Sequence, residues 1–338
     1  MSFFASPTRP KSNSAGLRRR LPYLAAATAL TVAAAAAVSA VAVPETLPTA
    51  SASTFSLQGW ATQGGGTTGG GSASPVTVTT ASALISNMQA SGSRVIRVSG
   101  TINLSGMNKV ASNKTIIGVG SGAAITGGGL NVANASNVII RNLNFRNWGD
   151  DAINVQYSTR VWVDHNSFSN GYDGAVDVKR ASDYVTVSWN KFSNHDKVGL
   201  IGHSDDNGGE DIGKLRVTYY ANWFDGTTQR HPRVRFGNPV HVVNNYYRGN
   251  SGYGVASTCN AGVYVERNYF ENVGSTVVTQ TGDSPQGNVK LLNNWLANSG
   301  TPASRNASRV AAIPYSYVVD AAEKVKSIVT SGAGTGKI

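Results

Sequence analysis

A short motif recurs along this chain at nearly constant spacing. An Asn, any residue and then an aromatic residue or Leu recurs at six regularly spaced positions, and β-branched residues precede each of these copies. Successive asparagines lie 24, 32, 23, 23 and 26 residues apart. A period in the low twenties with strand chemistry in every unit predicts a stacked β-solenoid, because no unit has room for two helices. The six motifs are Asn166/Phe168, Asn190/Phe192, Asn222/Phe224, Asn245/Tyr247, Asn268/Phe270 and Asn294/Leu296.

Stacking gives both repeated residue types a structural role. Amides at equivalent positions of successive coils predict a hydrogen-bonded ladder that satisfies the turn backbone. The aromatic rings two residues later are expected to stack inside the solenoid. One turn earlier, Phe145 lies 23 residues before Phe168, although Leu143 stands where the Asn would be.

Charged residues recur at almost one position relative to the aromatic residue of each coil. Neighbouring coils are about 4.8 Å apart, so these residues form a column of two acids beside two bases. Asp177 follows Asp173 by four residues, an even separation that places both on one face of a strand. Arg235 follows Arg230 by five residues. The column comprises Asp151, 6 after Phe145; Asp173, 5 after Phe168; Lys197, 5 after Phe192; and Arg230, 6 after Phe224.

Three carboxylates at close range repel one another and favour a bound cation. Asp151, Asp173 and Asp177 supply oxygen ligands only, and the five histidines of the chain lack zinc-ligand spacing. Oxygen ligands at an open site that is shared with substrate favour a hard ion, Ca²⁺ over Mg²⁺. We therefore predict a calcium site.

A cation beside Lys197 and Arg230 suits a sugar acid as substrate. Positive charge at the uronate carboxylate acidifies the proton at C5, and its removal breaks the bond at O4 by β-elimination. Hydrolysis is the alternative, with Asp150 and Asp151 as a pair of carboxyl groups. We expect Lys197 and Arg230 to lower the pKa of such a pair, which argues against a carboxylic acid catalyst.

The N-terminal segment has the features of an export signal. Arg18 to Arg20 form a positive region, Leu21 to Val41 are apolar, and Ala40-Val41-Ala42 has the small-x-small form of a cleavage site. The apolar run is long enough for a membrane anchor, and export is common to both interpretations. We predict a cleaved signal peptide over residues 1–42, a disordered segment over 43–56, a β-helix domain over 57–338, and secretion. Losing residues 1–42 removes five basic residues and lowers the formal net charge from +11 to +6.

A positive net charge suits a polyanionic partner, either nucleic acid or an acidic polysaccharide. The chain contains no nucleic-acid-binding motif after the signal, so we expect no nucleic acid. Cys259 is the only cysteine and is interpreted as a packing residue. We expect a monomer.

Four further segments complete the organisation. Ser82 to Gln89 predicts a short helix, and Val318 to Val329 predicts a helix that caps the open end of the solenoid. The 32-residue interval between Asn190 and Asn222 contains an insertion, residues 195–214, which is rich in Asp and Gly. We expect this insertion to form a wall beside the charged column. Residues 57–74 are rich in Gly and Ser, as in a linker.

Four motifs lie in and around the column: Val161-Trp162-Val163-Asp164-His165, the run from Asp173 to Phe192, His195-Asp196-Lys197 and Arg230-x-Pro232-x-x-Arg235. Together they closely resemble the pectate lyases of polysaccharide lyase family 1, and the resemblance extends over roughly residue 57 to the end of the chain. The resemblance implies a right-handed parallel β-helix that cleaves polygalacturonate by Ca²⁺-dependent elimination. It also implies that residues 57–74 lie on the helix instead of forming a free linker.

The family's functional residues are carried over by position. Asp151, Asp173 and Asp177 match its calcium ligands, Lys197 its substrate-binding lysine, Arg230 its catalytic base, and Arg235 its supporting arginine at the substrate. Some members have another acid at position 149, which is Gly149 here, and Asp150 is the candidate to compensate. Pectin lyases of the same family act on methyl-esterified polymer without Ca²⁺, so the retained acids favour the unesterified substrate. A non-catalytic β-helix adhesin would have the repeats without the sorted column.

Overall fold

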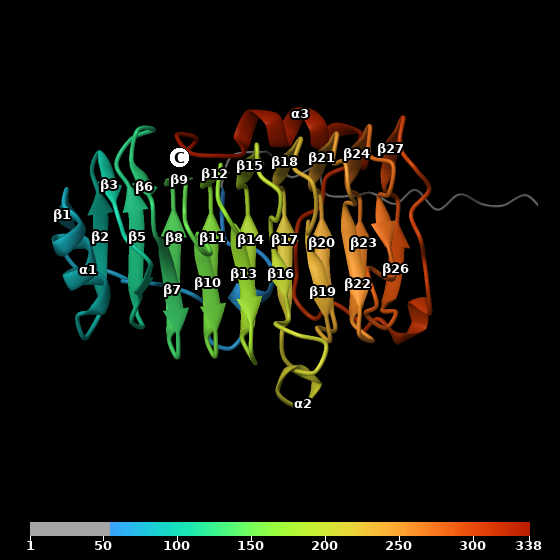
Figure 1. Cartoon of the computed structure of the whole chain (residues 1–338), viewed down its shortest axis with the longest axis horizontal. Coiled ribbons are helices and arrows are strands. Elements are labelled where there is room, and N and C mark those ends of the chain that lie inside the picture. Colours follow the sequence, from blue (N-terminus) through green and yellow to red (C-terminus); the bar gives the residue numbers. More distant parts are fainter. Residues whose placement is uncertain (1–54) are drawn as a thin grey trace, which may run out of the picture. The chain divides into compact units, whose positions relative to one another are not determined.

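A computed structural model describes residues 55–338, which form a right-handed parallel β-helix (Figure 1). The chain passes in turn through three parallel sheets, so each strand pairs with its equivalents one coil before and one coil after. The predicted signal peptide, residues 1–42, and most of the segment 43–56 lie outside the described residues and stay predictions. No helix of the described part is long and apolar enough to span a membrane.

The strands divide among three sheets, here named A, B and C. Sheet A comprises β1 (Val76–Val78), β2 (Arg94–Val98), β5 (Lys114–Gly118), β8 (Ser136–Arg141), β11 (Thr159–Asp164), β14 (Asp183–Ser188), β17 (Val217–Tyr220), β20 (Val240–Val243), β23 (Gly262–Glu266) and β26 (Asn288–Leu292). Sheet B comprises β3 (Thr101–Asn103), β6 (Ala124–Thr126), β9 (Asn144–Arg146), β12 (Ser167–Ser169), β15 (Lys191–Ser193), β18 (Trp223–Asp225), β21 (Tyr246–Arg248), β24 (Tyr269–Glu271) and β27 (Trp295–Ala297). Sheet C comprises β4 (Met107–Lys109), β7 (Gly129–Ala133), β10 (Ile153–Gln156), β13 (Val176–Lys179), β16 (Leu200–Ile201), β19 (Arg233–Arg235), β22 (Val255–Thr258) and β25 (Val277–Val278).

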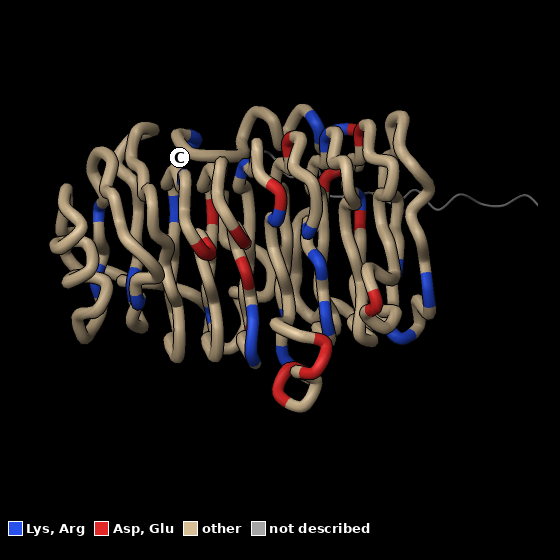
Figure 2. The backbone as a smooth tube through the Cα atoms, viewed as in Figure 1, with Lys and Arg blue, Asp and Glu red and all other residues tan. Residues whose placement is uncertain are grey.

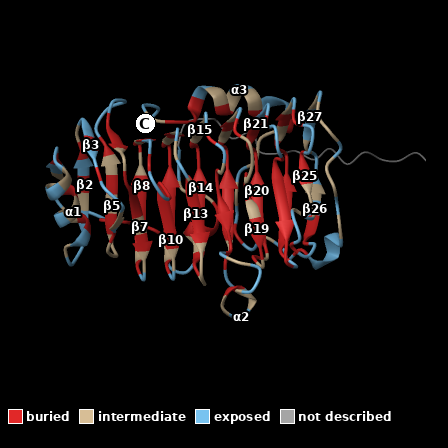
Figure 3. Ribbon diagram, viewed as in Figure 1, coloured by how far each residue is buried: buried red, intermediate tan, exposed pale blue. Residues whose placement is uncertain are grey.

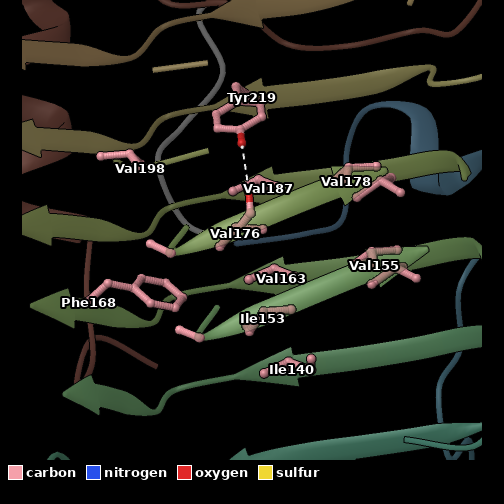
Figure 4. Close-up of a cluster of buried hydrophobic side chains, with 14 of the residues drawn as sticks. Ile140, Ile153, Val155, Val163, Phe168, Val176, Val178, Val187, Val198 and Tyr219 are labelled. Atoms are coloured by element: carbon pink, nitrogen blue, oxygen red, sulfur yellow. Dashed lines mark hydrogen bonds between the residues drawn. The ribbon is translucent and has the colours of Figure 1, made fainter. Parts of the chain in front are cut away.

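The core runs along the inside of the coils and is built from like residues at matched positions (Figures 3 and 4). Ile140 pairs in register with Val163, and Val163 with Val187, and all three are fully buried. Each buried aliphatic side chain of this kind contributes about 1.5–3 kcal/mol to stability. The repeat of β-branched residues in the sequence therefore becomes a continuous apolar column.

The asparagine ladder predicted from the sequence is confirmed. Each side-chain amide donates to the Oδ1 of the next ladder Asn at 2.9–3.0 Å, from Asn166 through Asn294. The same Oδ1 atoms accept backbone N–H groups, as Asn222 Oδ1 does from Asn190 at 3.1 Å. The residue before each ladder Asn has a positive φ of 48–54°, so the chain bends there within one residue and leaves backbone groups that the amides satisfy.

The aromatic stack is also confirmed. Five successive ring pairs lie with centroids 4.4–5.3 Å apart inside the solenoid, and they run Phe145, Phe168, Phe192, Phe224, Tyr247 and Phe270. The ladder and the stack fix the register of successive coils, so residues at one angular position lie directly above one another.

The N-terminal helix covers the first coil. α1 (Ala81–Gln89) begins after Thr80, whose side chain accepts from the Ala83 N–H at 3.3 Å. Its Leu84 and Met88 are fully buried in the core cluster, so α1 closes this end of the solenoid.

The C-terminal helix is present, but it lies in a different place from the one expected. α3 (Ala322–Gly332) packs along the flank of the coils, beside β21 and β24, and not over the last coil (Figure 1). Its Val325 and Val329 bury against Trp189, Tyr220 and Tyr246, which lie at or beside the corner between sheets A and B in successive coils. These side chains form an apolar strip along the flank, which a helix with one apolar face covers better than it covers the open end.

The Gly-rich segment packs against sheet A, as the resemblance implied. Its 3₁₀ turn η1 (Trp60–Thr62) lies across β14 and β17, where the Trp60 N–H donates to Thr218 Oγ1 and the Ala61 N–H to Thr186 Oγ1, both at 3.0 Å. A second 3₁₀ turn, η2 (Ala307–Arg309), lies beside β26. The insertion carries the short helix α2 (Gly208–Asp211), which projects from the coils.

Candidate active site

The predicted charged residues come together on the outside of sheet C and in the turns before its strands, where acidic and basic residues of adjacent coils lie side by side (Figure 2). Lys197 Nζ lies 3.3 Å and Arg230 Nη1 3.6 Å from the same atom, Asp173 Oδ1. The sorted column of the sequence is therefore a real surface feature with one acid between two bases.

The acids form a cluster next to this pair of bases. Asp150, Asp151 and Asp173 each offer a carboxylate oxygen, and these atoms lie within 4.8 Å of one another. Asp177 approaches Asp151 above Gly174, since a Cβ added to Gly174 would meet Asp177 Oδ1 at 2.2 Å and Asp151 Oδ1 at 2.9 Å. Only a residue without a side chain leaves this space open between the two carboxylates.

Lys179 is a member of the site that the sequence analysis missed. Its Nζ lies 2.7 Å from Asp151 Oδ2 and 3.4 Å from Asp177 Oδ2. The signal was available, because Lys179 follows Asp177 by two residues on β13 and so shares its face. In this structure the ammonium group links the two buried acids.

Burial governs the protonation of these acids. Burial and the nearby Asp177 carboxylate raise the pKa of Asp151 to about 7, and Lys179 offsets only part of this effect. Burial also raises the pKa of Asp177, whose Oδ1 accepts the Leu200 N–H at 3.0 Å. We expected Lys197 and Arg230 to lower the pKa of the Asp150 and Asp151 pair, but the pKa of Asp151 is raised, because desolvation outweighs the effect of the neighbouring Lys179.

Two buried side chains, His195 and Trp148, form hydrogen bonds to the backbone of Lys197 and Asp173. His195 packs against Trp148 with ring centroids 4.8 Å apart and ring planes tilted by 60°, and its Nε2 bonds to the Lys197 carbonyl at 2.8 Å. Burial lowers the pKa of His195, so the ring is neutral at pH 7 and its role is positional. Trp148 Nε1 also donates to the Asp173 carbonyl at 3.2 Å, which fixes the turn that carries this acid.

Arg235 lies on the same face of sheet C, but its carboxylate partner comes from the insertion. Its Nε donates to Asp205 Oδ1 at 2.5 Å, and its Nη1 donates to the Gly202 carbonyl at 3.2 Å. Ser284, from the loop after β25, donates to Asp205 Oδ2 at 2.7 Å. The insertion is thus anchored beside the column, and neither Asp205 nor Ser284 could be found from the repeat because both lie outside it.

Comparisons with known proteins agree with this geometry. A family model described as pectate lyase matches residues 27–338. A pectate trisaccharide-lyase of Bacillus licheniformis is 37% identical over 304 residues, which cover 84% of this chain and 87% of that protein. The chain belongs to the pectate lyase family. It is accordingly an enzyme of the polysaccharide lyase class.

Two further pectate lyases define the extent of the match. A pectate trisaccharide-lyase of Thermotoga maritima is 46% identical over 206 residues, but this match covers only 54% of this chain and 56% of that protein. The crystal structure of a pectate lyase from Bacillus sp. N165 in complex with trigalacturonate superposes with a TM-score of 0.75 at 33% identity, covering 83% of this chain and 99% of that one. The family model, which spans residues 27–338, includes the coils that carry the site.

A calcium ion, which the pectate lyase resemblance implies, fits the acidic cluster. The donors are carboxylate oxygens, which suit a hard cation, and they come from two adjacent coils that Gly174 allows to converge. Asp173 Oδ1 is buried and has no hydrogen bond of good geometry despite its two basic neighbours. Asp151, Asp173 and Asp177, with Asp150 at the exposed edge, would hold the ion.

Proposed function

We propose that this chain is a Ca²⁺-dependent pectate lyase that cleaves (1→4)-α-D-galacturonan by β-elimination and releases unsaturated oligogalacturonides. The observation that carries the proposal is the placement of Asp173 between Lys197 and Arg230, beside the acidic cluster. This surface offers both cations and cation-binding oxygens to one uronate group. The trigalacturonate in the related Bacillus sp. N165 structure supports the choice of sugar acid.

The bases of the column act on one sugar residue of the polymer. Lys197 binds the uronate carboxylate, and Arg230 accepts the proton from C5 of the same residue. The electron pair of the C5–H bond forms the C4–C5 double bond, the C4–O4 bond breaks, and the leaving O4 takes a proton from water. A Ca²⁺ ion bound at the acids supplies positive charge that stabilises the enolate-like transition state.

Arg230 must lose a proton before it can accept one, because a guanidinium group is almost always charged in proteins. The assignment of Arg230 as the base rests on the pectate lyase resemblance. Its Nη1 lies 3.6 Å from Asp173 Oδ1, and its Nε is buried without a hydrogen-bond partner among residues 55–338.

The product distinguishes the proposed reaction from its alternatives. Purified protein is expected to generate ultraviolet-absorbing unsaturated oligouronides from polygalacturonate, with EDTA stopping the reaction and Ca²⁺ restoring it. Reducing ends without ultraviolet absorbance would indicate hydrolysis. The raised pKa of Asp151 suits a general acid for hydrolysis, but membership of the pectate lyase family does not favour that reaction. EDTA-resistant cleavage of methyl-esterified pectin would indicate a pectin lyase.

The proposal includes secretion after cleavage near Ala42 and action as a monomer on a cell-wall polysaccharide. Both follow from the sequence features described above. N-terminal sequencing of protein from the culture medium of an expressing bacterium tests the cleavage site, and sedimentation analysis tests the monomer.

A further inference from the structure

Arg233 is a third arginine in this region, and it lies on β19 of sheet C together with Arg235. Neither the repeat nor the family motif assigned a role to Arg233. Arg233 lies on β19 next to Val234, which is buried in the core, so the Arg233 side chain is on the outer face. Arg233 pairs in register with Leu200, whose N–H bonds to Asp177. Arg233 therefore lies two coils, roughly 10 Å, from Asp177 along the solenoid.

The charges around Arg233 do not balance within the described residues. Arg230 pairs with Asp173 at 3.6 Å and Arg235 with Asp205 at 2.5 Å. Arg233 forms no ion pair with any residue from 55 to 338; its Nη2 donates to the Ser284 hydroxyl at 2.7 Å, and its buried Nε has no partner. Three neighbouring guanidinium groups repel one another, and only two carboxylates are paired with them. The remaining positive charge favours an additional anion.

A second orphaned donor lies beside the same arginines. The Tyr253 side chain is 9% exposed, and its hydroxyl approaches the backbone of Arg230 without a hydrogen bond of good geometry. The backbone places Tyr253 one coil beyond Arg230, since its N–H donates to the Thr228 carbonyl at 3.3 Å. Burial raises the pKa of Tyr253, so the hydroxyl is a donor at neutral pH.

We propose that Arg233 and Tyr253 form a second carboxylate subsite, which binds a uronate group of a sugar residue other than the one that reacts at Arg230. A carboxylate accepts from the Arg233 guanidinium group as a charge-assisted pair and from the phenol as a third donor. The inference rests on the proposed lyase function and specifies it further. The subsite requires a free acid at that sugar, because a methyl ester carries no charge to balance Arg233.

Kinetics on two substrates test the subsite in the active enzyme. Arg233→Gln is expected to raise KM for polygalacturonate about tenfold while kcat changes little, because the lost contact is remote from the reacting bond. The variant is also expected to lose part of the preference for polygalacturonate over partly methyl-esterified pectin. Tyr253→Phe, which keeps the ring, is expected to raise KM several-fold. Arg248→Gln, on sheet B with a 54% exposed side chain, is the matched control and keeps wild-type kinetics.

Binding without turnover separates this inference from the proposed function. Trigalacturonate is titrated calorimetrically into wild type, Arg233→Gln and Tyr253→Phe, and its fully methyl-esterified form serves as the second ligand. Weaker binding of the acid with unchanged binding of the ester supports the subsite, even if wild type releases no unsaturated product and the lyase function fails. Unchanged affinity for the acid in both variants, or an equal loss for both ligands, overturns it.

Discussion

Single residues of the column were predicted well where the repeat fixed their position. Counting from Phe145 and its successors predicted that Asp173, Lys197 and Arg230 gather at one position, and Asp173 Oδ1 lies within 4 Å of each of the two basic side chains. The same counting could not identify Lys179 or Asp205. Lys179 acts through its long side chain, which reaches back to acids near Gly174, and Asp205 belongs to an insertion without a period.

Arg230→Lys tests the assignment of the base. The lysine keeps a positive charge near Asp173 but is shorter and lacks the guanidinium group, so turnover on polygalacturonate is expected to fall by 10² or more, in the range of general-base catalysis. Binding of trigalacturonate, measured by calorimetry, is expected to stay within a few-fold of wild type. Wild-type turnover in this variant would refute the role of Arg230 as base.

His231 gives the fold a predictable response to acid. It is fully buried, with Nδ1 bonded to the Tyr253 carbonyl at 2.8 Å and Nε2 to Thr227 Oγ1 at 2.8 Å. Burial lowers the pKa of His231 from 6.5 to about 4. Because the unfolded state binds the proton first, the stabilising contribution is complete above about pH 6.5 and is lost as the pH falls to about 4.

This effect amounts to about 3 kcal/mol of unfolding free energy. Denaturant unfolding of wild type at pH 7 and pH 4.5 gives the total difference in unfolding free energy, to which His231 contributes. A His231→Gln variant is expected to show a smaller difference between the two pH values than wild type. An unchanged difference in His231→Gln would show that other groups control the response to acid.

At the scale of elements, sequence spacing predicted strands and coils but misplaced a helix. The ladder and the stack follow from local repetition, and each coil needs only its neighbours. α3 has no such partner in the repeat. Its site is a strip of residues near the corner between sheets A and B, including Trp189 and Tyr246, that becomes contiguous only after the coils have stacked.

The ladder predicts a sharp difference between two asparagines. Asn222 is fully buried, and its amide donates to the Val187 carbonyl and to Asn245 while its Oδ1 accepts from Asn190. Asn222→Ala is expected to lower the free energy of unfolding by about 3 kcal/mol, because it leaves buried polar groups unpaired. Asn298→Gly removes an exposed amide pair with Asn272 at a residue whose φ of 48° glycine adopts freely, and it is expected to cost within about 0.5 kcal/mol. Equal losses in chemical denaturation would contradict a structural role specific to the ladder.

Across the whole molecule, the acidic cluster links consecutive coils, so a cation bound there stabilises only the folded chain. Ca²⁺ at 100 times its Kd is expected to raise the free energy of unfolding by about 2.7 kcal/mol. Thermal melting over a Ca²⁺ titration measures this without any substrate. Asp177→Asn is expected to lose most of the rise in Tm, whereas Asp283→Asn, an exposed acid outside the cluster, retains it. A full rise in Asp177→Asn would place the ion elsewhere.

The vertical register set by the ladder also restricts how such a chain can change in length. A whole coil added near α1 or after β24 would leave every distance between Asp151 and Arg230 as it is. A coil added between β13 and β19 would move the acids and the guanidinium groups apart by one strand spacing, about 4.8 Å, without any loss of fold. The catalytic coils are therefore an indivisible block within an otherwise extendable scaffold, and grafting experiments on this enzyme should keep residues 145–235 together.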